Sequence, residues 1–265
     1  MGRGSVRPRS RPASFKTGLL EFLLQYQIDT IDLVMISHAD TDHIEGLIAI
    51  LGTNAIDVKM VRLNTDSLKG TDVWNDLLFE LDSRVKQGKT DFSPALTEND
   101  SGEFDSSEVT LEIIGPSVYL AAKGPNGKDT FERRITTNSI SAVIRVLYKG
   151  SPVALLTGDM DLIGLDEIDR GGKDMTAPIL VFPHHGGNAG TGMPAFSERL
   201  CQLAQPEQIL FSIGRGRYGT PIPEVIDRAR SVNAKMKISC TQLSEHWCGR
   251  AVEACRLGML REGSS

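Results

Sequence analysis

The chain has 265 residues and a formal net charge of −5 at pH 7; 40% of the residues are hydrophobic and 24% are charged. These proportions are typical of a soluble globular protein of one large or two small domains, and they exclude disorder over most of the chain. No apolar run approaches the roughly 20 residues of a membrane-spanning helix, so we expect no membrane attachment. The net charge argues against a protein coated in nucleic acid but permits a local basic groove.

The first sixteen residues carry five positive charges and no negative charge. Such a segment cannot bury apolar surface, so residues 1–16 are predicted to be a flexible basic arm and residues 17–265 a single domain. We interpret the arm as a solubilising tail in preference to an arm that contacts phosphates.

After the arm, short apolar runs alternate with amphipathic segments. Helices are predicted at residues 17–27, 44–51, 73–87, 194–204, 223–232 and 246–256. Strands are predicted at residues 31–36, 58–63, 109–114, 141–148, 153–156, 179–182, 208–213 and 235–240. Residues 149–152 are typical of a hairpin turn, and residues 88–107 and 115–137 are expected to be long loops. The pattern predicts a layered α/β fold with some antiparallel pairing.

The cysteines show no Cys-x-x-Cys pair and lie in the last quarter of the chain. They are Cys201, Cys240, Cys248 and Cys255. Because the sequence has no export signal, we expect reduced thiols and a cytoplasmic protein.

Four of the five histidines fall in two clusters, and each cluster directly follows a predicted strand. The first cluster runs from Ser37 to His43 and reads S-H-A-D-T-D-H; the second runs from Phe182 to Gly187 and reads F-P-H-H-G-G. Loops that follow buried strands commonly carry working residues. Accidental clustering of exposed histidines is a poor explanation.

Within the first cluster, alternate side chains of an extended backbone project to one side. His38, Asp40 and Asp42 are therefore expected to share a face, while His43 points elsewhere as a helix begins at residue 44. Imidazole and carboxylate groups are ligands for zinc, manganese or iron. The competing interpretation is an Asp that caps the helix with exposed histidines beside it, which explains either Asp42 or His43 alone but not four donor residues within six positions.

In the second cluster, neighbouring side chains point in different directions, so only one histidine is expected to bind a metal. We favour His184 as the ligand and His185 as an acid or phosphate contact that faces the substrate. Further along the chain, Arg215, Arg217 and Tyr218 form a glycine-flanked loop that can approach phosphates, with a solvated turn as the alternative. Asn138 is a candidate hydrogen-bonding residue of the site, although a turn role is as good an explanation.

These motifs resemble those of the metallo-β-lactamase fold, and most of all the C-terminal hydrolase domain of ComEC-type DNA-uptake proteins. The matching segments, in chain order, are the H-x-D-x-D-H loop at 38–43, T-T-N-S at 136–139, L-L-T-G-D at 155–159, P-H-H-G at 183–186 and S-I-G-R-G-R-Y-G-T-P at 212–221. The resemblance implies an αββα four-layer sandwich that lacks its usual opening strands. Two alternatives follow: the true start of the protein lies upstream, or a partner protein or a second copy of the chain covers the sheet edge left open.

The resemblance also implies two divalent metal ions, Zn²⁺ or Mn²⁺, bridged by Asp159; a turn-forming Asp would be the interpretation without it. The implied ligands are His38, Asp40, Asp42, His43, Asp159 and His184. Thr220 stands where the family usually has a histidine, which removes a ligand or proton-transfer group from that position.

The leading hypothesis is a metal-dependent phosphodiesterase that cleaves DNA through a metal-bridged hydroxide. Its catalytic residues are Asp42 and His185, and Arg215, Arg217, Tyr218 and Asn138 contact the substrate. One alternative is a hydrolase of small phosphodiesters or lactones. Another is a metal-stabilised interaction module without catalysis.

Overall fold

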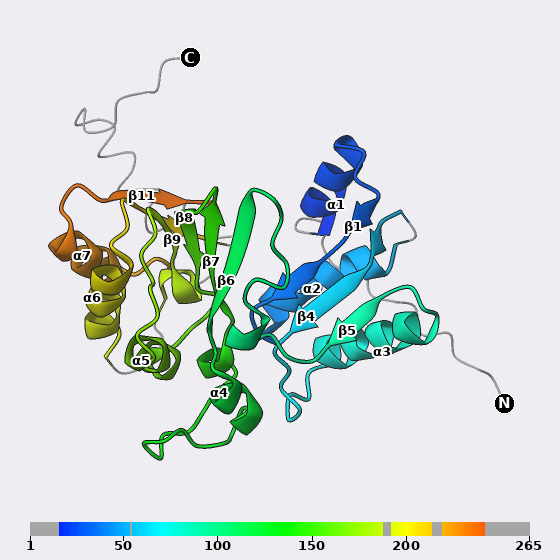
Figure 1. Ribbon diagram of the computed structural model, residues 1–265, viewed down its shortest axis with the longest axis horizontal. Helices are drawn as coiled ribbons and strands as arrows, with labels where there is room; N and C mark the ends of the chain where they lie inside the picture. Colours follow the sequence, from blue (N-terminus) through cyan, green and yellow to red (C-terminus); the bar gives the residue numbers. More distant parts are fainter. Residues whose placement is uncertain (1–15, 54, 188–191, 214–218, 242–265) are drawn as a thin grey trace. The chain divides into compact units, whose positions relative to one another are not determined.

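The computed structural model describes residues 16–53, 55–187, 192–213 and 219–241, which form two compact units (Figure 1). The first unit contains the described residues up to Val34, Asp40–Val61 and Lys69–Phe92; the second contains Met35–Ala39, Arg62–Leu68 and the described residues from Ser93 on. Neither unit is a continuous stretch of sequence, because the chain passes back and forth between them. The prediction of a single domain over residues 17–265 stays a prediction.

The first unit is built from three helices and short strands. Its elements are α1 (Lys16–Gln25), β1 (Thr30–Ile31), α2 (Thr41–Leu51), β3 (Asp57–Val58) and α3 (Asp72–Lys86). Strand β1 pairs with β3 in parallel. Helices α2 and α3 are in contact, and each buries an apolar stripe with the spacing of a helix. Three further strands, each divided between the units, form a sheet in the order β2-β4-β5: β2 (Val34–Ile36), β4 (Met60–Leu63) and β5 (Asp91–Ser93).

The second unit contains a six-stranded sheet in the order β11-β10-β9-β8-β7-β6 (Figure 1). Its strands are β6 (Val109–Gly115), β7 (Val143–Tyr148), β8 (Ser151–Leu156), β9 (Ile179–Val181), β10 (Gln208–Phe211) and β11 (Lys237–Cys240). Its helices are α4 (Val118–Lys123), α5 (Leu162–Arg170), α6 (Met193–Ala204) and α7 (Pro223–Val232), with 3-10 turns η1 (Glu98–Asp100), η2 (Asn138–Ile140) and η3 (Pro183–Gly186). Strands β6, β7 and β8 pair antiparallel, whereas β8, β9, β10 and β11 are parallel neighbours.

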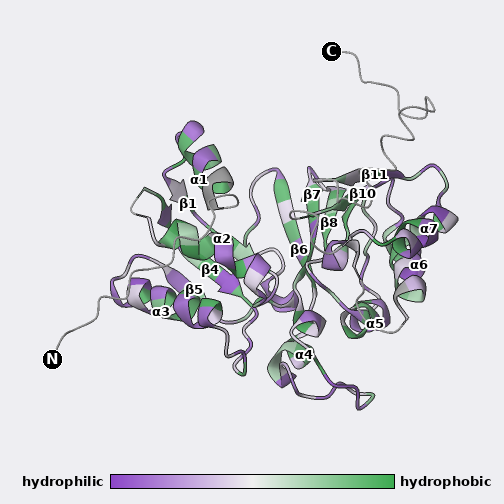
Figure 2. Cartoon of the chain, turned by 180° about the vertical axis from the view of Figure 1, so that it is seen from behind, coloured by the Kyte–Doolittle hydropathy of each residue, from purple (hydrophilic) through white to green (hydrophobic). Residues whose placement is uncertain are grey.

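Both faces of this sheet carry apolar side chains. Successive side chains of a strand point to opposite faces, so neighbouring apolar residues belong to different clusters. Val143 belongs to the large core that helices α5, α6 and α7 form with the sheet, and the next residue, Ile144, belongs to a smaller cluster with Leu96 and Ile113. Figure 2 shows hydrophobic colour along the central strands, while α6 and α7 carry both colours. The helices therefore bury one face and expose the other.

The mixed α/β class and most of the expected elements are confirmed. The single strands expected at 31–36 and 58–63 were wrong: each is two short strands, interrupted at residues 32–33 and at Lys59. The expected long loops contain β5, η1 and α4. Helix α5 was missed because Gly164 interrupts its helical pattern; Gly164 packs where a Cβ would lie 2.9 Å from Met160 Cγ. The helix expected at 246–256 lies outside the described residues, as does the arm except for Lys16, the first residue of α1.

The β7–β8 hairpin is tighter than expected. Its turn consists of Lys149 and Gly150, both with positive φ (51° and 76°), which is the arrangement of a type I′ turn. Ser151 and Pro152, expected in the turn, are the first residues of β8. Two positive φ values match the twist of the strands, so the hairpin needs only two turn residues.

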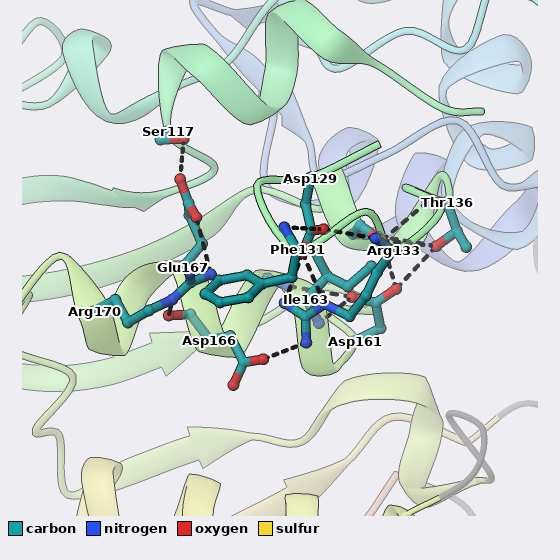
Figure 3. Close-up of polar contacts among 12 residues, drawn as sticks. Ser117, Asp129, Phe131, Arg133, Thr136, Asp161, Ile163, Asp166, Glu167 and Arg170 are labelled. Atoms are coloured by element: carbon teal, nitrogen blue, oxygen red, sulfur yellow. Dashed lines mark hydrogen bonds and ion pairs between the residues drawn. The ribbon is translucent and has the colours of Figure 1, made fainter. Parts of the chain in front are cut away.

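Charged side chains hold the segment at 124–137 to α5 (Figure 3), and α5 in turn pairs with α6. Asp166 on α5 pairs with Arg133 from this segment and with Arg199 on α6. Asp129 accepts hydrogen bonds from the backbone of Phe131 and Arg133 at 2.9 and 2.8 Å. Asp166 is therefore the residue through which three elements meet.

We expect Asp166→Asn to lower the free energy of unfolding by about 1 to 2 kcal/mol at pH 7, because two charge-assisted contacts are lost at a partly solvated position. Burial raises the pKa of Asp166, but the hydrogen bonds and charges of Arg133 and Arg199 outweigh it and hold the pKa below the ordinary value of 3.8. A carboxylate with a depressed pKa stabilises the fold above its unfolded pKa and loses that effect as the pH falls.

Urea unfolding of both proteins at pH 7 and at several pH values below 4 tests this. The difference between wild type and variant should shrink below pH 4. Asp82→Asn is the control, because Asp82 forms an exposed i,i+4 pair with Lys86 and should change stability by less than about 0.5 kcal/mol. A difference for Asp166→Asn that does not change with pH would contradict the prediction.

Candidate metal centre

Two candidate residues of the second unit, Asp159 and His184, follow strands of its sheet that run in parallel and end together. Leu156 at the end of β8 is in register with Val181 at the end of β9. The next residue, Thr157, donates its hydroxyl hydrogen to the carbonyl of Val181 at 2.7 Å. The segments that follow the two strands, with Asp159 and His184, are therefore neighbours.

Asp159 is placed by a turn that only glycine can make. Gly158 has φ +52°, and a Cβ there would lie 2.5 Å from Ser37 Cβ and 2.6 Å from Ser141 Oγ. The turn brings Asp159 back to the sheet, where its backbone N–H donates to Ser141 Oγ at 2.9 Å. Its carboxylate is largely buried, with the residue 7% exposed.

His184 contacts both oxygens of this carboxylate. Its backbone N–H donates to Asp159 Oδ1 at 3.2 Å, and its Nδ1 lies 3.6 Å from Asp159 Oδ2. His184 and His185 both adopt left-handed backbone conformations, with φ 52° and 56°. Non-glycine residues rarely do so, and such strain is concentrated at functional sites.

The His184 imidazole is suited to bind a cation. Burial lowers the pKa of His184 below the ordinary value and so favours the neutral ring. The negative charge of the Asp159 carboxylate opposes this shift but does not outweigh it. The Nε2 of His184 is buried and has no hydrogen-bond partner among the described residues. An imidazole with such a buried Nε2 and with Nδ1 3.6 Å from the Asp159 carboxylate belongs to a donor set that fits a divalent metal ion.

His38 approaches Asp159 from another segment of the second unit. It follows β2, is fully buried, and its Nε2 lies 3.9 Å from Asp159 Oδ2. Its Nδ1 lies 2.9 Å from Ser37 Oγ and 3.0 Å from Ser141 Oγ. The structure thus brings together three of the residues expected to bind metal: two imidazoles around one carboxylate oxygen.

The other expected ligands belong to the first unit. Asp40 is the N-cap residue of α2, and its carboxylate pairs with Lys69, a partner that no local sequence signal predicts. Asp42 and His43 lie in the first turn of α2, with Asp42 Oδ2 3.8 Å from His43 Nε2. The expectation that Asp42 continues an extended run was wrong, because α2 begins at Thr41 and not at residue 44. The metal-binding roles of Asp40, Asp42 and His43 stay predictions.

His185 differs from His184 in what it contacts. Its Nδ1–H donates to the carbonyl of Ser212, which follows β10. This bond fixes the proton on Nδ1, so a neutral ring carries its lone pair on Nε2. The separate roles expected for His184 and His185 stay predictions.

The expected substrate-contacting residues are only partly described. Asn138 lies in η2, and its side-chain Oδ1 is buried without a hydrogen-bond partner in the described part of the chain. Arg215, Arg217 and Tyr218 lie outside the described residues. Thr220 is buried, 8% exposed.

Sequence reasoning missed two supporting residues, Ser141 and Asp161. Asp161 caps α5 by accepting hydrogen bonds from the backbone of Ile163 and Gly164. Its other oxygen accepts hydrogen bonds from the hydroxyls of Thr136 and Ser139 at 2.9 and 2.6 Å; Figure 3 shows Thr136 beside Asp161. An Asp directly before an amphipathic segment is a capping signal, so α5 and the role of Asp161 could have been found together.

Comparison with known proteins agrees with the motifs. A model of the metallo-beta-lactamase superfamily matches residues 5–193. The chain is 25% identical over 211 residues to ComE operon protein 3 of Bacillus subtilis (strain 168), covering 78% of this chain and 23% of that protein. It therefore spans about a quarter of the length of this relative. Igni18, a metallo hydrolase from the archaeon Ignicoccus hospitalis KIN4/I, matches in structure with a TM-score of 0.44 and 13% identity, over 81% of this chain and 77% of that chain.

We expect Gly158→Ala to lower the free energy of unfolding by about 3 kcal/mol or more, because the methyl group adds overlap with Ser37 and Ser141 to an unfavourable φ. Gly150→Ala is the matched control: Gly150 also has a positive φ, 76°, but no atom lies within 4 Å of an added Cβ. The control should lose only about 1 kcal/mol. Urea unfolding measures both, and equal losses would contradict the close packing around Gly158.

Proposed function

Because the chain belongs to the metallo-β-lactamase superfamily, we propose that this hydrolase is a divalent-metal-dependent phosphodiesterase that cleaves DNA. The observation that carries the proposal is the placement of the imidazoles of His38 and His184 around Asp159 Oδ2. When bound, divalent cations lower the pKa of water and stabilise negative charge on a phosphoryl oxygen.

Six side chains are the proposed ligands of two ions, Zn²⁺ or Mn²⁺. They are His38, Asp40, Asp42, His43, Asp159 and His184. The contacts of Asp159 support its place between the ions, because the backbone N–H of His184 holds Oδ1 and leaves Oδ2 facing both imidazoles. The carboxylates add hard, anionic oxygen donors, which suit Mn²⁺ and still permit Zn²⁺.

His185 is the proposed proton-transfer or phosphate-contacting group. With its Nδ1–H held by the carbonyl of Ser212, Nε2 is the atom that exchanges a proton with a reacting oxygen. Asp42 is the second proposed catalytic residue, and its side chain is 60% exposed, which makes it accessible to substrate and solvent.

DNA as the substrate is supported by the motif resemblance to ComEC-type hydrolase domains and by the match to ComE operon protein 3. Arg215, Arg217 and Tyr218 are proposed to contact phosphates, and the buried Oδ1 of Asn138 is an acceptor that a substrate group can meet. A cytoplasmic location and a partner protein or second copy along the N-terminal sheet edge belong to the same proposal. Within the described ranges, no helix is both long and apolar enough to cross a membrane.

We expect the purified protein to cleave single-stranded DNA in the presence of Mn²⁺, and Asp42→Ala to reduce the rate by about 10³-fold or more. Gel analysis of a labelled oligonucleotide measures the rate, and elemental analysis measures the bound metal. Asp76→Ala is the matched control, because Asp76 is also an exposed aspartate within a helix of the first unit.

Cleavage that persists in Asp42→Ala would contradict the proposed site. If a chromogenic small phosphodiester is hydrolysed far faster than DNA, the substrate is a small phosphodiester and DNA is wrong. Bound metal without turnover of either substrate would contradict the proposed enzymatic activity and favour a metal-stabilised interaction module.

A further inference from the structure

One buried hydroxyl group joins two of the proposed ligands. Ser141 lies between η2 and β7 and is 2% exposed. Its Oγ accepts the backbone N–H of Asp159 at 2.9 Å and lies 3.0 Å from His38 Nδ1. Asp159 and His38 come from distant parts of the sequence, so this contact links them directly.

The position of the protons follows from this arrangement. The Asp159 N–H occupies one lone pair of Ser141 Oγ and leaves the other lone pair and the hydroxyl proton. A neutral histidine that binds a cation through Nε2 must carry its proton on Nδ1. In His38 that proton then points at the oxygens of Ser141 and Ser37, and the ring is held with Nε2 toward Asp159 Oδ2.

Ser141 and Ser37 both contact His38, but they differ in what else they contact. Ser37 is adjacent to His38 in sequence, whereas Ser141 also fixes the backbone of Asp159. The Ser141 hydroxyl also lies against Gly158, where an added Cβ would be only 2.6 Å from Oγ. The absence of a side chain at Gly158 therefore leaves the space that this hydroxyl occupies.

We propose that Ser141 is a positioning residue of the metal centre: its hydroxyl fixes the Nδ1–H form of His38 and orients His38 relative to Asp159. The proposal rests on the metal-binding roles of His38 and Asp159 in the proposed function. Outer groups that orient a ligating histidine typically contribute about 10- to 100-fold to metal affinity.

Ser139 provides a matched control. It is equally buried, at 1% exposed, and its hydroxyl donates to Asp161 Oδ2 at 2.6 Å. This bond joins the same two stretches, at 136–141 and 157–161, but the Ser139 hydroxyl contacts Thr136 and Asp161 and not the proposed ligands His38 and Asp159. A purely structural role for the two serines predicts the same result for both alanine variants.

The test measures the Zn²⁺ affinity of wild type, Ser141→Ala and Ser139→Ala by competition with a chromophoric chelator, together with urea unfolding of the metal-free proteins. We expect Ser141→Ala to weaken Zn²⁺ binding by about 10- to 100-fold. Ser139→Ala should lower the unfolding midpoint but leave the affinity within about threefold of wild type, because it leaves the His38 contacts intact. Equal affinities for the two variants would overturn the inference.

A second measurement needs no folded variant of Ser141. Long-range ¹H–¹⁵N spectra of the wild-type histidines report which ring nitrogen carries the proton, with His38 assigned by comparison with His38→Gln. We expect His38 in the metal-free protein to be protonated on Nδ1. Protonation on Nε2, with the Ser141 hydroxyl donating to Nδ1, would overturn the inference.

The outcomes separate this inference from the proposed function. Wild-type protein that binds neither Zn²⁺ nor Mn²⁺, or that binds Zn²⁺ as well after His38→Ala, overturns both. Wild-type protein that binds Zn²⁺ through His38 but is unaffected by Ser141→Ala overturns only the role of Ser141. Weaker binding in Ser141→Ala, with unchanged binding in Ser139→Ala, supports both.

Discussion

Parallel pairing of β8, β9 and β10 is the constraint on which the candidate centre depends. Parallel strands end at the same edge of a sheet, so the residues that follow them become neighbours however far apart they are in sequence. Asp159, His184 and Ser212 follow these three strands, and the contacts of Asp159 with His184 and of His185 with Ser212 result from it. The large apolar core, formed with α5, α6 and α7, packs against one face of the same strands.

Residues that follow apolar strands could be predicted from the sequence. The runs before His38, Asp159 and His184 are apolar, and the change to His, Asp and Gly marks where each strand ends. The same reasoning located β6 to β11 within a few residues. This reasoning succeeds because a buried strand is a run of apolar residues and its exposed end is a change to polar residues, and both can be recognised in the local sequence.

Contacts between distant polar side chains could not be predicted. Nothing near Asp40 in the sequence indicates that Lys69 is its partner, and Ser141 reads as the first residue of a strand. The start of α2 was missed because the loop was interpreted as extended from His38 to Asp42, whereas the backbone turns helical after Asp40. The positive φ of His184 also could not be predicted, because it depends on the path that the backbone takes through η3 after β9.

The interleaved course of the chain determines the order in which the units can form during synthesis. The first unit has all of its residues once Phe92 has been made. The segments at 35–39 and 62–68 are made early but belong with residues from Ser93 onward, so they wait for the rest of the chain. His38 therefore leaves the ribosome long before Ser141 and Asp159, and its imidazole acquires its buried surroundings only when those later residues have been translated.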